Sequence, residues 1–127
     1  MSVPVPVEEL ADAVARYGPV AYLLTTGDDM RPHATHVVVE VDGGTIRCGI
    51  GRRTARNAAE RSAISLLWSP NEEGDYSLIV DGDIEVTGTP GEDAAGVITV
   101  THAILHRTAS APTEGDCDSD CKPVDIA

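Results

Sequence analysis

The segment Ser77–Thr89 constrains the fold most, because apolar and acidic residues alternate along it. The apolar side chains fall at even positions: Leu78, Val80, Ile84 and Val86. Successive side chains of a strand point to opposite faces, so this pattern predicts a strand with one buried face and one exposed face. The pair Asp81-Gly82 is also compatible with a two-residue hairpin turn. The alternation keeps its phase through Gly82, however, which favours one long strand bent at the glycine.

Five other segments are β-prone and are separated mostly by short turns. They are Val20–Thr26, His33–Val41, Thr45–Ile50, Ala63–Trp68 and Val97–His106. Turns at 27–29 and 42–44 predict hairpins. Helical spacing predicts one helix over Val7–Tyr17 and a second from Thr54 to about Arg61. The chain is therefore predicted to be mainly β with short helices, as a six-stranded antiparallel barrel. A single inserted helix does not supply the repeated βαβ units of a dinucleotide-binding fold.

Length, charge and cysteine usage narrow the class of protein. We expect one domain over residues 1–108 and an acidic tail over residues 109–127. The net charge of −12 argues against general nucleic-acid binding. The chain contains no long apolar run that predicts a membrane span, and the first residues do not resemble a signal peptide. Three cysteines, an odd number, favour reduced thiols and a cytoplasmic location.

Positive charge is concentrated in one segment, Arg47–Arg61. Five of the nine basic residues of the chain lie there. The segment is predicted to run from a strand through a glycine turn into a helix, and backbone N–H groups at a helix N-terminus attract anions. Arg52, Arg53 and Arg56 can add charge-assisted hydrogen bonds, and Thr54 can cap the helix or donate its hydroxyl to a phosphate. The alternative is a solvated basic helix. The sequence contains neither a Walker A motif nor a GxGxxG motif.

Several ordered pieces of the sequence resemble the pyridoxamine 5′-phosphate oxidase-like split β-barrel family. The pieces are YLLTT at 22–26, GDDMRPHA at 27–34, VDGGTI at 41–46, RNAAERSAISL at 56–66 and IVDGDIEV at 79–86. The resemblance covers roughly residues 7–107 and rests on the ordered series of pieces. It implies an FMN-binding split-barrel fold, assembled as a homodimer with FMN or the deazaflavin F420 at the subunit interface.

The resemblance also implies which residues hold the cofactor. Its phosphate is expected beside the turn that leads into the basic helix, where Arg52, Arg53, Thr54, Arg56 and Asn57 lie. The ring system is expected against the second and third strands. The residues in question are Thr35, His36, Val37, Gly49 and Ile50.

Two departures from the family pattern define the functional alternatives. Many relatives carry a lysine three positions before Asn57, where this chain has Thr54. The pyridoxamine phosphate substrate signature is not recognisable, so we do not predict vitamin B6 synthesis. The favoured function is an FMN- or F420-binding oxidoreductase that transfers hydride to an unknown small substrate. The alternative is a non-catalytic dimeric barrel that has lost its flavin and acts as a binding or carrier protein.

Other candidate groups do not predict a metal site or a catalytic residue. His102 and His106 lie about 13 Å apart if they share a strand, which is too far for joint chelation. Cys117 and Cys121 have no obvious further ligands at zinc-site spacing, although a disulfide between them is possible. His33 and His36 lie on opposite faces of one predicted strand, and we favour His36 as the residue nearer the ligand.

Overall fold

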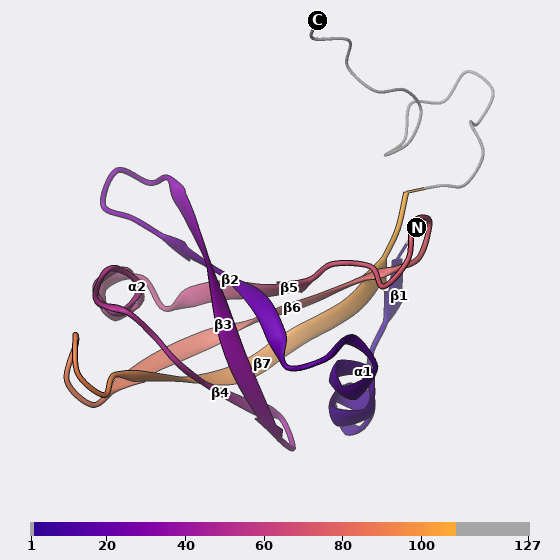
Figure 1. The fold of residues 1–127 in the computed structure, drawn as a ribbon, viewed down its shortest axis with the longest axis horizontal. Helices are drawn as coiled ribbons and strands as arrows, with labels where there is room; N and C mark the ends of the chain where they lie inside the picture. The colour runs from indigo at the N-terminus through magenta and orange to yellow at the C-terminus, as the bar shows by residue number, and fades with distance from the viewer. Residues whose placement is uncertain (1, 109–127) are drawn as a thin grey trace, which may run out of the picture.

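The computed structural model describes residues 2–108, and it is mainly β with two short α-helices. The strands are β1 (Ser2–Pro4), β2 (Val20–Thr26), β3 (Pro32–Asp42), β4 (Thr45–Gly49), β5 (Ala63–Trp68), β6 (Ser77–Thr87) and β7 (Ala95–His106). A 3-10 turn (Val7–Glu9) leads into α1 (Leu10–Tyr17), and α2 (Arg52–Glu60) lies between β4 and β5. Figure 1 shows the two helices at opposite ends of the barrel.

The strands form a closed antiparallel barrel, as predicted. The sheet order is β1-β7-β4-β3-β2-β5-β6, and an additional β6–β7 pairing closes the ring formed by β2 to β7. The strand β1, which was not predicted, pairs with the last residues of β7. The predicted strand boundaries agree with the structure to within two residues. The predicted tail, with Cys117 and Cys121, lies outside the described residues.

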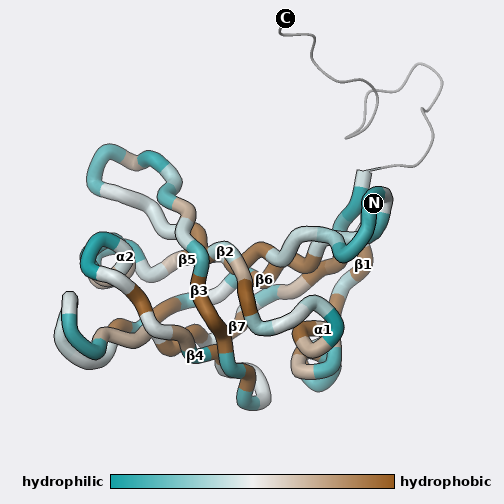
Figure 2. The backbone as a smooth tube through the Cα atoms, viewed as in Figure 1, coloured by the Kyte–Doolittle hydropathy of each residue, from teal (hydrophilic) through white to brown (hydrophobic). Residues whose placement is uncertain are grey.

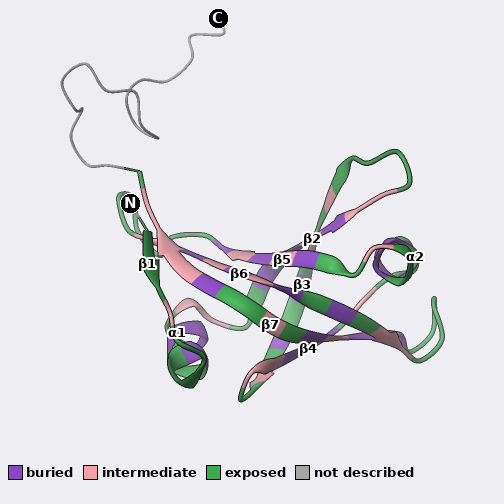
Figure 3. Cartoon of the chain, turned by 180° about the vertical axis from the view of Figure 1, so that it is seen from behind, coloured by how far each residue is buried: buried purple, intermediate pink, exposed green. Residues whose placement is uncertain are grey.

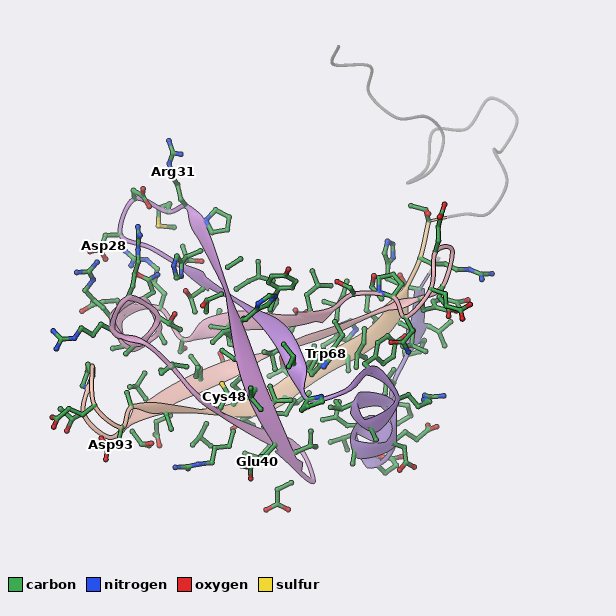
Figure 4. All side chains as sticks on the ribbon, viewed as in Figure 1. Asp28, Arg31, Glu40, Cys48, Trp68 and Asp93 are labelled. Carbon is green, nitrogen blue, oxygen red and sulfur yellow. The ribbon has the colours of Figure 1, made fainter. Side chains whose placement is uncertain are left out.

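The inside of the barrel is filled by aliphatic side chains from alternate strand positions. Leu23, Ile46, Leu66, Val80 and Ile98 are each completely buried, and Figures 2 and 3 show apolar, buried stretches recurring along the strands. Trp68 is 1% exposed and donates through its indole N–H to the Gly18 carbonyl at 3.0 Å. Its position near α1 is visible in Figure 4.

The helix α1 covers one end of the barrel with a narrow apolar face. Leu10, Ala13 and Val14 are buried, while the residues between them are exposed or half-buried. The Gly18 N–H donates to the Val14 carbonyl at 2.9 Å, and Gly18 has φ 97°. A glycine tolerates this left-handed conformation without steric cost, which ends the helix and turns the chain into β2.

The β6–β7 pairing closes the barrel, and its register shifts at Asp81 and Gly82. This confirms one long strand that bends at the glycine, and excludes a hairpin turn at that point. A Cβ at position 82 would lie 2.5 Å from the Thr99 carbonyl oxygen and 2.7 Å from Ile98 Cγ2. The close approach of β7 therefore requires a residue without a side chain at this position.

Gly82→Ala is expected to destabilise the fold by about 1–3 kcal/mol, because the added methyl group overpacks against the β7 backbone. Urea unfolding followed by circular dichroism measures the change. Gly49→Ala is the matched control, since a Cβ at Gly49 meets nothing within 4 Å. Equal stability of the two variants would contradict the steric role of Gly82.

Cys48 lies on β4 inside the barrel and is 3% exposed (Figure 4). Burial raises the pKa of its thiol to about 11, although a hydrogen bond with the Gly96 backbone acts in the opposite direction. Because the fold favours the protonated thiol, this contribution to stability is complete below the ordinary thiol pKa of about 8.5. It is lost as the pH rises toward 11.

We expect the Cys48 thiol to react with a disulfide reagent at pH 8 at least ~100-fold more slowly than an unfolded thiol, because the thiolate is the nucleophile. The measurement uses the Cys117→Ser, Cys121→Ser variant, in which Cys48 is the only cysteine. The same variant in urea provides the reference rate. Similar rates in the folded and unfolded protein would show that the thiol is accessible.

Candidate functional site at the arginine pocket

The helix α2 begins earlier than the sequence predicted. It starts at Arg52 with Gly51 as its N-cap, no side chain caps it, and the Ala55 N–H donates to the Gly51 carbonyl at 2.9 Å. Thr54 is therefore not the N-cap; it lies inside the first turn and is 3% exposed. Of the two roles considered for the Thr54 hydroxyl, capping the helix is excluded, because Gly51 is the N-cap and has the extended conformation that this position requires.

A buried hydrogen bond attaches α2 to the barrel. Asn57 is 3% exposed, and its amide nitrogen donates to the Thr25 hydroxyl at 3.2 Å. Thr25, near the end of β2, is itself 2% exposed. Ala55 and Ala58 are also buried, so the short side chains let the helix lie close to the strands. This attachment fixes which residues of α2 face the neighbouring turn.

The turn between β2 and β3 lies beside α2. It is closed by the Gly27 N–H, which donates to the Arg31 carbonyl at 3.0 Å, and by the Met30 N–H, which donates to the Gly27 carbonyl at 2.9 Å. Asp28 accepts a hydrogen bond from Arg61 at 3.1 Å, and Asp29 accepts one from the Arg31 backbone at 3.0 Å. Figure 4 shows Arg31 extending away from this turn.

The turn and the helix enclose a pocket of about 300 Å³. We call it the arginine pocket; it is lined by Gly27, Asp28, Asp29, Arg31, Pro32, His33, Arg53, Arg56 and Asn57. The lining contains three arginines and two aspartates. Both aspartates already form an ion pair, Asp28 with Arg61 at 3.1 Å and Asp29 with Arg31 at 3.6 Å. Arg53 and Arg56 form no ion pair with any residue in the range 2–108.

The ten predicted cofactor residues do not all meet in this pocket. Arg53, Arg56 and Asn57 line it. The Arg52 guanidinium packs instead against Gly91 in the connection between β6 and β7. Val37 and Thr54 are buried at 5% and 3% exposure, and Thr35 is half-buried on the same face of β3 as Val37.

The remaining predicted residues lie at two other places. Gly49 and Ile50 are at the end of β4, where the Ile50 N–H donates to the Ala94 carbonyl at 3.1 Å. His36 is exposed on the outer face of the barrel, and its ring centroid lies 4.3 Å from that of Tyr22. His36 and Tyr22 line a separate pocket of about 350 Å³, together with Tyr17 and Trp68.

The sequence interpretation missed His33 as a pocket residue. The predicted alternation of β3 had already placed His33 opposite His36, and the structure confirms that the two side chains differ in exposure. Their separation along the strand does not tell which of the two faces reaches the arginines. That depends on the contact of α2 with the β2–β3 turn, which lies outside any local pattern.

The outer face of β2 and β3 carries an apolar patch around His36. Val20, Tyr22 and Val38 are 51%, 39% and 63% exposed. Val20 and Val38 are cross-strand partners, as are Tyr22 and His36. We call Val20, Tyr22 and Val38 the outer apolar patch. Patches of neighbouring exposed apolar residues are typical of interaction surfaces.

Two curated sequences are similar to this chain over nearly their whole length. They are the uncharacterized proteins Mb0449c of Mycobacterium bovis and MT0457 of Mycobacterium tuberculosis, each 38% identical over an alignment that covers 92% of either chain. No protein-family profile matches the sequence. No helix within residues 2–108 is long and apolar enough to cross a membrane.

Solved structures share the fold at low sequence identity. A Clostridium acetobutylicum protein related to general stress protein 26, of the pyridoxinephosphate oxidase family, has a TM-score of 0.65 at 13% identity and covers 81% of this chain and 91% of its own. An F420 reductase has a TM-score of 0.60 at 19% identity, covering 80% and 98%. A heme-binding protein of Mycobacterium smegmatis has a TM-score of 0.61 at 17% identity, covering 80% and 54%.

These likenesses extend over most of the barrel and include the predicted family. The chain therefore belongs to one family with the two mycobacterial proteins, and its fold is that of the pyridoxamine 5′-phosphate oxidase-like split β-barrels.

Proposed function

We propose that the protein is an FMN- or F420-binding oxidoreductase that transfers hydride to a small substrate. The observation that carries this proposal is the pair of arginines, Arg53 and Arg56, which line a pocket without an ion-pair partner among residues 2–108. In a chain of net charge −12, unpaired cations beside one pocket favour an anionic ligand. The fold is shared with an F420 reductase and with a pyridoxinephosphate oxidase family protein.

The residues present fit the anionic end of such a cofactor. Arg53 and Arg56 would hold its phosphate, and the buried Asn57 bond to Thr25 keeps the helix that carries both arginines in place. The cofactor itself would supply the hydride chemistry, while the barrel binds it, orients it and excludes water. Val37 is a core residue at 5% exposure, so it supports the strand and does not offer a contact surface for a ring.

A homodimer is part of the proposal. Arg53 and His36 lie on different surfaces, so one subunit does not bring them to a single ligand. A site built from two subunits removes this difficulty, because the His36 face of one subunit can lie against the cofactor held by its partner. The outer apolar patch surrounds His36 and would be covered by this contact.

We also place the protein in the cytoplasm, in keeping with the buried free thiol of Cys48.

The second candidate is a non-catalytic barrel that binds or carries a ligand. Thr54 favours it, because this residue stands where many relatives have lysine and its side chain is buried. Such a protein would lack the charge that the lysine contributes to phosphate binding. The absorption spectrum of the purified protein separates the candidates, with flavin or deazaflavin bands supporting the first. The heme-binding protein of M. smegmatis shares the fold, so the spectrum should also be inspected for heme bands. A heme spectrum would overturn the first candidate.

Arg53→Ala with Arg56→Ala is expected to weaken binding of FMN or F420 at least ~100-fold, because each of the two arginines removed takes away a charge-assisted hydrogen bond of about 1.5–3 kcal/mol. Fluorescence titration measures the affinity. Arg47→Ala is the control, since Arg47 is an exposed residue of β4 outside the pocket. An unchanged affinity in the double variant would place the phosphate elsewhere, and no binding of either cofactor at micromolar concentration would reject the function.

Val38→Lys is expected to convert a dimer into a monomer, because it places a charge in the centre of a desolvated contact. Light scattering after size-exclusion chromatography measures the mass against the 13.3 kDa of one chain. Glu40→Lys, two residues further along the same exposed face, is the control for the change of charge. A monomeric wild-type protein, or a Val38→Lys variant that remains dimeric, would contradict the role of the patch.

A further inference from the structure

His33 is the residue of the arginine pocket whose hydrogen bonding is unexplained. It lies on β3 opposite Thr25, one residue after Pro32, and lines the pocket with Arg53 and Arg56. Its Nδ1 atom is buried and has no hydrogen-bond partner among the described residues. Buried polar atoms are nearly always paired, so the unpaired nitrogen of this ring is an exception that calls for an explanation.

The two ring nitrogens of His33 differ in access. Only Nδ1 is sealed from solvent without a partner, so Nε2 is the nitrogen that can meet a ligand in the pocket. A proton on Nδ1 would be a buried donor with no acceptor, which costs about 1–3 kcal/mol. A bare Nδ1 would be a buried acceptor with no donor, so Nδ1 is unpaired in either form of the ring. An anion can only accept, so a proton on Nε2 is what lets the ring bind an anion in the pocket.

The groups around His33 favour an anion as that occupant. Arg53 and Arg56 line the pocket from α2, and Arg31 lines it from the β2–β3 turn, where it contacts Asp29. The acceptors nearby are Asp28 and Asp29, and each already contacts an arginine. No hydrogen bond joins His33 to either aspartate among the described contacts. An anion between the arginines would therefore be the acceptor that the accessible ring nitrogen lacks.

We propose that His33 is a direct ligand of the anion held in the arginine pocket, and that it donates from Nε2 to a phosphate oxygen. This rests on the proposed function, because it concerns the same pocket. It adds a donor on a strand to the two cationic side chains of α2. The arginines would supply the attraction, and His33 would determine which oxygen of the phosphate faces β3.

Two substitutions separate the ring nitrogens. The amide nitrogen of glutamine can occupy the place of Nε2, whereas that of asparagine reaches only the place of Nδ1. Inorganic phosphate is the first probe and FMN the second, titrated at constant ionic strength into ¹⁵N-labelled protein. We expect His33→Gln to retain the phosphate affinity within about threefold. We expect His33→Asn to lose about tenfold, the value of one hydrogen bond to a charged group.

The ring signals of the wild-type protein provide a readout that does not depend on the variants folding. The chain has four histidines, and phosphate should shift the His33 Nε2 signal through the new hydrogen bond, while the signals of His102 and His106 stay unchanged. His106→Gln is the control variant, because His106 pairs with Ser2 between β1 and β7.

Each outcome decides a different claim. No phosphate or FMN binding by the wild-type protein would overturn both the arginine pocket and the role of His33. Normal binding of phosphate without any change in the His33 ring signals would overturn the role of His33 alone. Equal phosphate affinity in the His33→Gln and His33→Asn variants would do the same. Retention by Asn with loss by Gln would show that Nδ1 is the donor, and would overturn the proposed orientation of the ring.

Discussion

The pairing of β6 with β7 is the constraint on which the rest of the structure depends, because it turns an open sheet into a barrel. Without it the strand order would leave two edges with unsatisfied backbone groups. Closure requires β7 to pass close to β6 at Gly82, where the register shifts and no side chain fits. The glycine inside an otherwise alternating strand is therefore a condition for the interior in which Cys48 and Trp68 are buried.

The attachment of α2 to the barrel determines which arginines line the pocket. The segment between β4 and β5 contains the helix α2, which the buried bond between Asn57 and Thr25 fixes to the end of β2. The turn after β2 then lies next to that helix. Its two aspartates contact Arg61 and Arg31, so that Arg53 and Arg56 have no acidic partner within the described chain. The pocket is thus cationic because the nearby acids are already engaged, in a protein that is strongly acidic as a whole.

The sequence predicted the barrel well and the candidate site only in part, for a physical reason. Strand alternation and turn residues are local signals, so the hairpins and the bent β6 could be read directly. The strand β1 was missed because Ser2–Pro4 is only three residues long and is defined by its pairing with β7. The arginines could not be separated, because Arg52 and Arg53 are each within one helical turn of Arg56. Only the orientation of α2 on the barrel sends Arg52 to Gly91 and Arg53 to the pocket.

The two faces of strand β3 are the reason for proposing a site that is built from two subunits. Its inward side carries His33 toward the arginines, and its outward side carries His36 into the outer apolar patch. A ligand held by one subunit through the first side cannot reach the second side of the same strand. If both histidines contact one cofactor, the His36 that does so must come from the partner subunit. The anion-binding role of His33 and the interface role of the patch can therefore fail independently, but a complete site of this kind needs both.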